Sequence, residues 1–288
     1  MLKHQGLVYY LFLSYAYTLE QEEIGVDELI YLFRPFSFNP QAVRVLLSRL
    51  KKNGIVSNRR AGKKSYYFLT EEGKKRLAWG GNQIFAKQPL EWNGKWRTVV
   101  YNIPEKIRKK RDEFRFYLMF NRYGCLNNGI WISPEGKGGI PLESLKGKIY
   151  DLGIESYVQI FTAENLGPGD NGSIVAKAYN LEKMIAEYKN FIKKYQAKMV
   201  SYQEAKKKGK KIQIEKYYVE RFELAYDFLE LIKLDPKLPG ELLPADWNGG
   251  QAEKLFHQYA CELNEPTYAY FGREVKISPT DMLAIFPI

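Results

Sequence analysis

Residues 39–70 contain no aspartate or glutamate, although they include eight lysine and arginine residues. Histidine and cysteine are scarce in the whole chain, with two of each among 288 residues. The distant cysteines, Cys125 and Cys261, predict neither a disulfide framework nor a metal site, and so few cysteines are typical of a cytoplasmic protein. The histidines, His4 and His257, are likewise too far apart to indicate a catalytic triad or a zinc site.

Long apolar runs are missing too. Residues Gln5–Tyr17 are largely apolar, but this run is too short to span a bilayer and no small-residue cleavage site follows it, so we predict a buried helix there. Hydrophobic residues make up 45% and charged residues 27% of the chain, which is ordinary for a globular protein of two or three domains. The net charge of +11 favours an anionic partner.

The stretch without acids begins with a predicted helix. Asn39 is a favourable N-cap residue, Pro40 suits the first helical position, and Asn53-Gly54 favours a helix end. Four apolar residues between them follow the i, i+3, i+4, i+7 spacing of a helix with one buried face: Val43, Leu46, Leu47 and Leu50. The residues on the opposite face are polar or basic: Gln41, Arg44, Ser48 and Lys51.

Two short β-prone segments follow, Ile55–Asn58 and Ser65–Leu69, and the turn between them, Arg59–Lys64, holds four cations. A basic helix face beside a basic hairpin suits the phosphate backbone of duplex DNA, so we predict a winged helix-turn-helix with this helix as its recognition helix. The alternative is an ordinary solvated helix face and a soluble turn. The expected DNA contacts are Gln41, Arg44, Ser48, Arg49, Lys51, Arg59, Arg60, Lys63, Lys64 and Tyr66.

Two further helices are predicted in this DNA-binding domain, residues 1–80. Val26–Phe33 has two acidic residues in its first turn, Asp27 and Glu28, which the positive end of the helix dipole favours. Thr70 is a favourable N-cap for the second helix. Glycines at its end break this helix, and we expect a linker at residues 81–94.

Residues 95–180 alternate between strand-like and helix-like segments. Within the second strand-like segment, Asn128-Gly129 predicts a tight turn. The alternation indicates a small ferredoxin-like α/β sandwich. Strands are predicted at Trp96–Ile103, within Cys125–Ser133, at Glu155–Ala163 and at Ser173–Asn180, and helices from Pro104 to about Tyr123 and at Leu142–Leu152.

A literal G-x-G-x-x-G sequence occurs at Gly167–Gly172. A dinucleotide-binding loop requires a strand before this motif and a helix after it, whereas a strand-like run follows here. Asp170 within the motif would also repel a pyrophosphate. We therefore predict a hairpin loop, and we expect no catalytic residue, metal ligand or cofactor in the chain.

Residues 181–288 are predicted to be mostly helical, which makes the whole chain an α+β protein. Helices are expected from Leu181 to beyond Tyr195, at about Ile214–Leu234 and at Ala252–Leu263. The segment Lys206–Lys211 lies between the first two helices and contains five lysines. We expect it to be a solvated loop, and the alternative is an additional set of phosphate contacts.

Three stretches together resemble one known family, the PaaX repressors of phenylacetate catabolism. They are AVRVLLSRLKKNGIVSNRRAGKKSYYFLTEEG, EWNGKWRTVVYNIPEKIRKKRDEFRFYL with GIWISP, and DPKLPGELLPADWNG, in this order along the chain. The resemblance implies binding of operator DNA as a dimer, repression of phenylacetate-degradation genes and release from DNA by phenylacetyl-coenzyme A. The residues after Glu265 have no counterpart in the resemblance.

The resemblance raises the question of an effector pocket. An aryl-coenzyme A needs aromatic walls and a few cations. A stripe of core residues has the same pattern in the sequence, so both interpretations stay open. The candidate wall residues are Tyr217, Tyr218, Phe222, Tyr226 and Trp247.

Two alternatives to a ligand-responsive repressor remain. Residues 95–180 also look like the small ferredoxin-like protein of CRISPR adaptation complexes, some members of which are metal-dependent nucleases. Such a nuclease needs a carboxylate at the end of the first strand to hold a divalent cation. Asn102 occupies that position here, and its neutral amide is a poor ligand, which disfavours this function. The second alternative is a basic DNA-binding protein without an effector.

Overall fold

The computed structural model describes residues 6, 23–75, 91–137, 139 and 141–271. Of the predicted helix Gln5–Tyr17 only Gly6 falls within these residues, and the predicted linker is described only from Glu91 onward.

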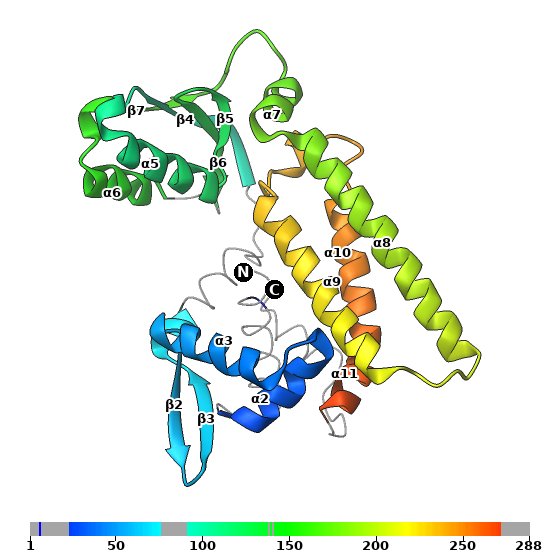
Figure 1. Ribbon diagram of the computed structural model, residues 1–288. Coiled ribbons are helices and arrows are strands. Elements are labelled where there is room, and N and C mark those ends of the chain that lie inside the picture. Colours follow the sequence, from blue (N-terminus) through cyan, green and yellow to red (C-terminus); the bar gives the residue numbers. More distant parts are fainter. Residues whose placement is uncertain (1–5, 7–22, 76–90, 138, 140, 272–288) are drawn as a thin grey trace. The chain divides into compact units, whose positions relative to one another are not determined.

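The chain divides into two compact units. The first unit comprises residues 1–87, 191–233 and 251–288, and the second comprises residues 88–190 and 234–250. Each unit combines helices with one antiparallel sheet, which confirms the predicted α+β class (Figure 1).

The N-terminal part of the first unit is a small sheet packed with two helices. The strands are antiparallel, and β3 lies between β1 and β2. Residues 71–75 are helical, as predicted, and the Gly73 N–H donates to Thr70 Oγ1 at 2.9 Å. The elements are β1 (Ile24–Gly25), α2 (Val26–Phe33), the 3-10 helix η1 (Arg34–Phe36), α3 (Pro40–Lys52), β2 (Val56–Ala61) and β3 (Lys64–Leu69).

The ends of α3 agree with the sequence prediction. Asn39 Oδ1 accepts a hydrogen bond from the Ala42 N–H at 2.8 Å, and Pro40 is the first helical residue. Gly54 follows the helix with a φ of +70°, a conformation that glycine adopts without strain. The predicted apolar face is buried, and each of its side chains contributes about 1.5–3 kcal/mol of hydrophobic stabilisation: Val43, Leu46, Leu47 and Leu50. The polar face is thereby held outward.

The hairpin after α3 differs from its prediction in one respect. The strands extend further than expected, so Arg59 and Arg60 lie in β2, and Lys64 lies in β3. The turn is reduced to two residues, Gly62 and Lys63, with Gly62 at φ +61°. A glycine with positive φ at the first of two turn residues is typical of a type II′ hairpin turn, and the sequence prediction overlooked this signal.

The second unit holds a four-stranded antiparallel sheet with the order β5-β6-β4-β7. The predicted linker residues 91–94 belong to its first strand, and Gly94 has a φ of +83° where the register shifts between Trp92 and Trp96. Asn128-Gly129 forms the predicted turn between β5 and β6. The elements are β4 (Glu91–Tyr101), η2 (Glu105–Ile107), α5 (Arg108–Phe120), β5 (Gly124–Asn127), β6 (Ile130–Lys137), α6 (Leu142–Leu152), η3 (Glu155–Tyr157) and β7 (Val158–Ala163).

Each face of this sheet is covered by a separate apolar cluster. Val99 and Trp131 point to the face that α5 and α6 cover, where they meet Phe114 and Leu145. The opposite face carries Trp96 and Ile132, against residues of α7 and of the segment after α9. Alternation along β4 therefore places its side chains in two different cores.

Residues Ser173–Asn180 are not a strand, contrary to the prediction. Residues 173–179 fall in α7 (Asn171–Tyr179), and Asn180 is its C-cap. The N-cap Asp170 accepts a hydrogen bond from the Ser173 N–H at 2.9 Å. The motif Gly167–Gly172 thus does lie between a strand and a helix, and the predicted hairpin loop is wrong. The Asp170 carboxylate occupies the N-terminus of α7, where a pyrophosphate would have to bind, so the motif remains unsuitable for a dinucleotide.

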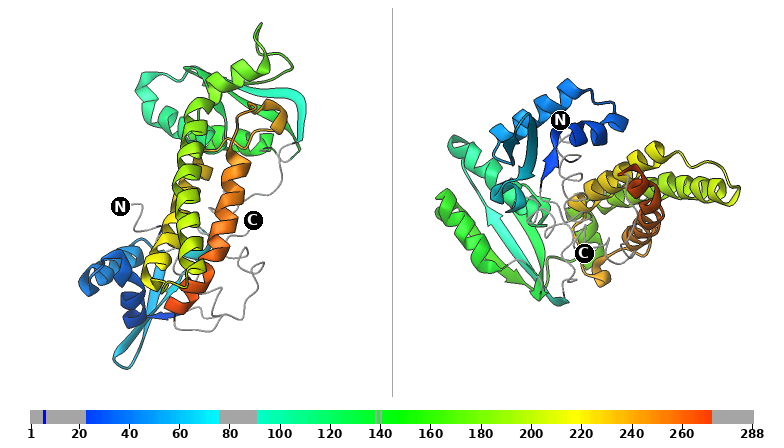
Figure 2. Two further views of the ribbon diagram at one scale, coloured as in Figure 1. Left: turned by 90° about the vertical axis from the view of Figure 1, so that its right-hand side faces the viewer. Right: turned by 90° about the horizontal axis from the view of Figure 1, so that it is seen from below.

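Three of the remaining helices are long, and each has residues in both units. Figures 1 and 2 show α8 (Leu181–Lys207), α9 (Ile214–Leu234) and α10 (Gly249–Glu262) side by side. The 3-10 helix η4 (Gly240–Leu242) and the short helix α11 (Asn264–Tyr270) complete this part. No described helix is both long and apolar enough to cross a membrane.

Candidate nucleic-acid interface

The outward face of α3 carries several of the predicted DNA-contacting residues. Gln41, Arg44 and Ser48 are exposed and stand one helical turn apart. Arg49 and Lys51 are exposed as well, and Lys51 Nζ donates to Asn58 Oδ1 of β2 at 2.6 Å. Lys52 is also exposed on this helix, although the sequence prediction left it out.

The β2–β3 hairpin presents cations on both of its faces. Arg60 pairs with Ser65 on the face shared with Asn58, so this arginine lies on the side of the hairpin that Lys51 contacts. Arg59 and Lys64 lie on the other face, next to Tyr66. The exposed Lys63 occupies the turn itself.

Arg59 has an acidic partner that the sequence prediction missed. Its Nε donates to both carboxylate oxygens of Glu23, at 2.7 and 2.9 Å, and its guanidinium lies 5.0 Å from the centre of the half-buried Tyr66 ring. The hydrogen bond to Glu23 raises the pKa of Arg59. Glu23 lies upstream of residues 39–70, and the pairing of β1 with β3 brings it close. Any anion that contacts Arg59 would therefore compete with the Glu23 carboxylate.

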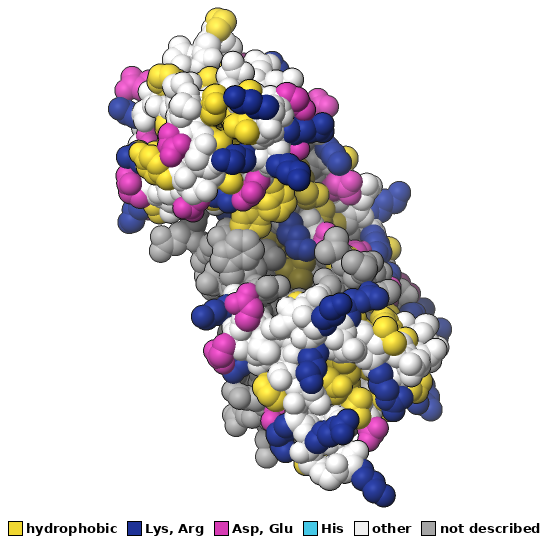
Figure 3. Space-filling model, turned by 60° about the vertical axis from the view of Figure 1, so that its left-hand side comes forward, with side chains coloured by type: hydrophobic (Ala, Val, Ile, Leu, Met, Phe, Trp, Pro, Cys, Tyr) yellow, Lys and Arg dark blue, Asp and Glu magenta, His cyan; other side chains and the backbone are white. Residues whose placement is uncertain are grey.

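Five other cations of the interface differ from Arg59, because they have no salt-bridge partner among the described residues: Arg44, Arg49, Arg60, Lys63 and Lys64. In Figure 3, dark blue Lys and Arg side chains are spread over the lower body, which contains α3 and the hairpin, with few magenta carboxylates among them. The result is a positive, polar surface that protrudes as a helix and a hairpin.

This interface is attached to the helical part of the first unit through α2 and η1. Tyr218 of α9 donates its hydroxyl to the Leu32 carbonyl oxygen at 3.1 Å, and the Phe36 ring meets the Tyr218 ring edge-on at 5.5 Å. The Tyr31 ring stacks on the Tyr270 ring of α11. The exposed Arg34 donates to Glu215 at 2.6 Å. Aromatic packing supplies most of this attachment, since exposed ion pairs contribute little.

The aromatic residues predicted for an effector pocket occupy different places. Tyr217, Tyr218 and Phe222 are buried in the first unit, where Tyr217 packs against Tyr202 and the other two pack against Phe36. Tyr226 is half-buried beside Phe222. These four residues form part of a packed core.

Trp247 belongs to the second unit instead. Its ring lies edge-on to Tyr188 at 5.2 Å, and it packs against the cluster around Trp96. The structure therefore brings the four α9 residues together and leaves Trp247 in another cluster.

Among the described residues of the second unit, no cluster of acids resembles a catalytic metal site. Asn102 is exposed just after β4, and its backbone N–H donates to the Tyr157 carbonyl oxygen at 3.0 Å. Throughout the described part of the chain, no three His, Cys, Asp or Glu side chains are placed to hold a metal ion.

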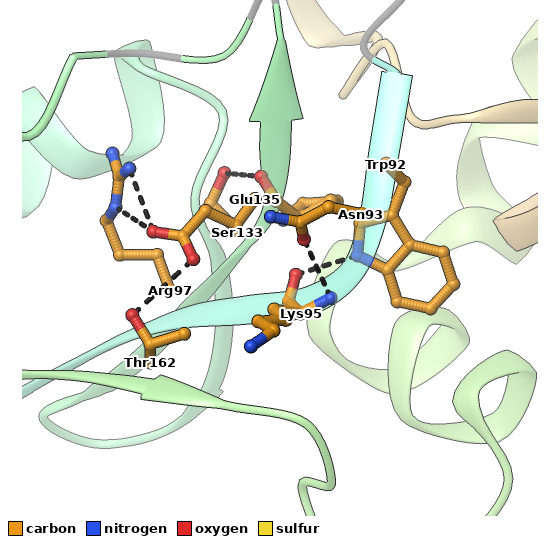
Figure 4. Close-up of polar contacts among 8 residues, drawn as sticks. Trp92, Asn93, Lys95, Arg97, Ser133, Glu135 and Thr162 are labelled. Carbon is orange, nitrogen blue, oxygen red and sulfur yellow. Dashed lines mark hydrogen bonds and ion pairs between the residues drawn. The ribbon is translucent and has the colours of Figure 1, made fainter.

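The carboxylate of Glu135, on β6, has partners of its own. Figure 4 shows it between Arg97 and Thr162: Arg97 donates to Oε1 at 3.1 and 3.3 Å, and Thr162 donates to Oε2 at 3.4 Å. The same view shows how the β4 bulge is closed, with Trp92 Nε1 donating to the Lys95 carbonyl oxygen at 2.7 Å. Both groups of contacts stabilise the sheet.

Comparisons with known proteins cover most of the chain. Residues 5–73 match the model of the PaaX-like protein family, residues 89–175 match the PaaX protein central Cas2-like domain, and residues 179–273 match the PaaX-like protein C-terminal domain. The transcriptional repressor PaaX of Escherichia coli is 25% identical over 236 residues, which are 81% of this chain and 72% of that protein.

One solved structure, the uncharacterised protein Rv0674 of Mycobacterium tuberculosis, has a similar fold. Its TM-score is 0.61 at 22% identity, over 85% of this chain and 90% of the other. The three family models follow one another in order from residue 5 to residue 273, and the chain therefore belongs to the PaaX family.

Proposed function

We propose that this chain is a transcriptional repressor that binds duplex DNA through α3 and the β2–β3 hairpin. One observation carries the proposal: a capped helix and a tight hairpin present their cations outward, with no acid between Asn39 and Thr70. Phosphate contacts require such a surface. The name of the Escherichia coli relative supports the same role.

The DNA-binding part is proposed to be a winged helix-turn-helix. In this arrangement α2 and α3 are the two helices, α3 enters the major groove, and the hairpin is the wing. Arg44 stands on the outward face of α3, and its guanidinium has two donors that suit the O6 and N7 atoms of guanine. Lys63 and Lys64 at the hairpin tip are proposed to contact phosphates.

We propose three domains: residues 1–80 bind DNA, residues 95–180 form a ferredoxin-like domain, and residues 181–288 dimerise or sense a ligand. The β-α-β-β-α-β order from β4 to β7 supports the ferredoxin-like assignment. One recognition helix reads too few base pairs to select an operator in a genome, so a homodimer on a roughly palindromic operator is proposed.

The proposed effector is phenylacetyl-coenzyme A or a related aryl-coenzyme A. Such a ligand releases DNA only if it binds more tightly to the arrangement that cannot bind DNA. A hundredfold loss of operator affinity corresponds to about 2.7 kcal/mol of coupling, an ordinary value for allostery. The packing of α2 against α9 and α11 supports a physical route for that coupling.

Selection of bound sequences from random DNA, repeated with a panel of acyl-coenzyme A thioesters, tests the proposal with the full chain. We expect a palindromic consensus, two protomers for each duplex by sedimentation, and displacement by an aryl-coenzyme A. Absence of any sequence preference would contradict the repressor. Operator binding that no thioester changes would leave the proposed repressor in place but remove an acyl-coenzyme A as its effector.

The same preparation tests the enzymatic alternative. Incubation with DNA or RNA in Mg²⁺ or Mn²⁺ is expected to yield no cleavage. Cleavage that Asn102→Ala abolishes would instead establish a nuclease in the second unit.

A further inference from the structure

The connection between α8 and α9 is a lysine-rich turn with a fixed backbone. We call residues Lys206–Lys211 the lysine turn. The Lys210 N–H donates to the Ala205 carbonyl oxygen at 3.0 Å, the Gly209 N–H donates to the Lys206 carbonyl oxygen at 3.1 Å, and Gly209 has a φ of +61°. These two hydrogen bonds form a Schellman cap, which holds the end of α8 in one conformation.

Two side chains of the lysine turn form ion pairs with nearby glutamates. Lys206 pairs with Glu265 at 2.6 Å, and Lys208 pairs with Glu204 at 3.6 Å. The other three lysines of the turn, Lys207, Lys210 and Lys211, are exposed and have no salt-bridge partner among the described residues.

Lysines near the end of a helix also have an ordinary structural role. The negative end of the helix dipole favours cations in the last turn, and this accounts for Lys206 and Lys207. It does not account for Lys210 and Lys211, because both lie beyond the capping residue Gly209, outside the helix. The helix dipole therefore leaves this pair of exposed cations without a structural role.

The lysine turn is connected to the DNA-binding surface within the first unit. Glu215, in the first turn of α9, pairs with Arg34 at 2.6 Å, and Arg34 lies in η1 between α2 and α3. Glu215 is therefore engaged with Arg34. Since η1 leads into the N-terminal end of α3, the contact ties the start of α9 to the end of the recognition helix that lies nearest the bases in a helix-turn-helix complex.

We propose that Lys207, Lys210 and Lys211 form a second phosphate-binding surface, which contacts duplex DNA flanking the sequence that α3 reads. This inference rests on the proposed function, because it requires the chain to bind duplex DNA. The surface adds affinity without sequence preference, and it lengthens the contacted DNA beyond the site of the recognition helix and the wing.

The test measures how the affinity of the full chain for a mixed-sequence duplex depends on salt. The variant K207A/K210A/K211A is compared with K106A/K109A/K110A, which removes three exposed lysines from η2 and α5 in the second unit and lowers the net charge equally. We expect the slope of log affinity against log salt, between about 50 and 200 mM, to shrink by about 0.9 for each phosphate that the first variant no longer neutralises. The control is expected to keep the wild-type slope.

The outcomes separate the two proposals. Wild-type protein that fails to bind any duplex would remove the proposed function and this inference together. Wild-type binding with an unchanged slope in K207A/K210A/K211A would overturn the inference alone, and so would an equal decrease of the slope in both variants, because net charge would then explain it. Charge reversal in K210E/K211E is expected to weaken binding further, while thermal unfolding checks that all variants fold.

Discussion

Tyr31 and Tyr270 stack on each other and exchange hydrogen bonds, although 239 residues separate them in the chain. Their ring centres are 4.8 Å apart and nearly parallel. Tyr270 donates its hydroxyl to the Tyr31 carbonyl oxygen at 2.9 Å, and Tyr31 donates to the Tyr270 carbonyl oxygen at 3.3 Å. The pair fixes α2, and through it the interface, to the last described helix of the chain.

Replacing Tyr270 by phenylalanine tests how much this attachment contributes. Tyr270→Phe removes one hydroxyl and keeps the stacked ring, so the free energy of unfolding is expected to fall by about 0.5–1.5 kcal/mol. Urea denaturation followed by far-UV circular dichroism measures the change. The matched control is Tyr150→Phe, because Tyr150 is 65% exposed and lies in the second unit, whereas this pair lies in the first. An equal decrease in both variants would contradict the structural role of the pair.

Arg44 and the hairpin lysines are expected to affect DNA binding in different ways. Arg44→Ala should weaken operator binding by about 1–3 kcal/mol and relax the preference at one position of each half-site. Lys63→Ala or Lys64→Ala should weaken binding to all sequences alike and reduce the salt slope by about one. Selection from random DNA with each variant distinguishes these effects. An unchanged sequence preference in Arg44→Ala would mean that α3 is not the recognition helix.

Glu23 is expected to weaken DNA binding by holding Arg59. Glu23→Gln removes the negative charge beside Arg59, so affinity for a mixed-sequence duplex should rise by roughly up to tenfold at low salt. The control is the same substitution in an Arg59→Ala background, where little gain is expected. A gain of the same size in both backgrounds would show that Glu23 acts on the DNA directly rather than through Arg59.

Stability is expected to fall in alkaline solution. Burial raises the pKa of several tyrosines above the ordinary value of about 10, and most strongly for four of them: Tyr179, Tyr195, Tyr259 and Tyr270. The folded protein therefore keeps phenol protons that the unfolded chain releases, and the stabilisation is complete below about pH 10 and decreases as the pH rises above it. The tyrosinate absorbance of these four residues should thus appear together with unfolding. Titration of all tyrosines near pH 10 in a folded protein would contradict this.

Local patterns in the sequence were enough to predict several elements. The cap at Asn39 and the apolar spacing predicted the observed ends of α3. The predicted helix Ile214–Leu234 has the same bounds as α9. Ser173–Asn180 was misassigned because Ile174 and Val175 suggest a strand, whereas the Asp170 cap favours a helix. When β-branched residues and a capping residue disagree, the sequence alone does not decide between them.

In the site, the contacts between residues that are distant in the chain could not be predicted from the sequence. The exposed positions on α3 followed from periodicity, but the Glu23–Arg59 pair depends on the pairing of β1 with β3. The aromatic stripe of α9 could not be assigned to a pocket or a core from its spacing. Tyr218 in this stripe contacts Leu32, which lies 186 residues away in the chain, and it also packs against Phe36.

The division of the chain into two units limits how chimeras of this protein and its relatives can be designed. Chain segments of the two units alternate along the sequence, with changes after residues 87, 190, 233 and 250, and the last three fall inside α8, α9 and α10. Exchanging the C-terminal region between relatives would therefore also exchange the surface on which Tyr31 and Leu32 rest. In a chimeric regulator, α2 and α3 should therefore come from the same parent protein as α9 and α11, although separate parts of the gene encode them.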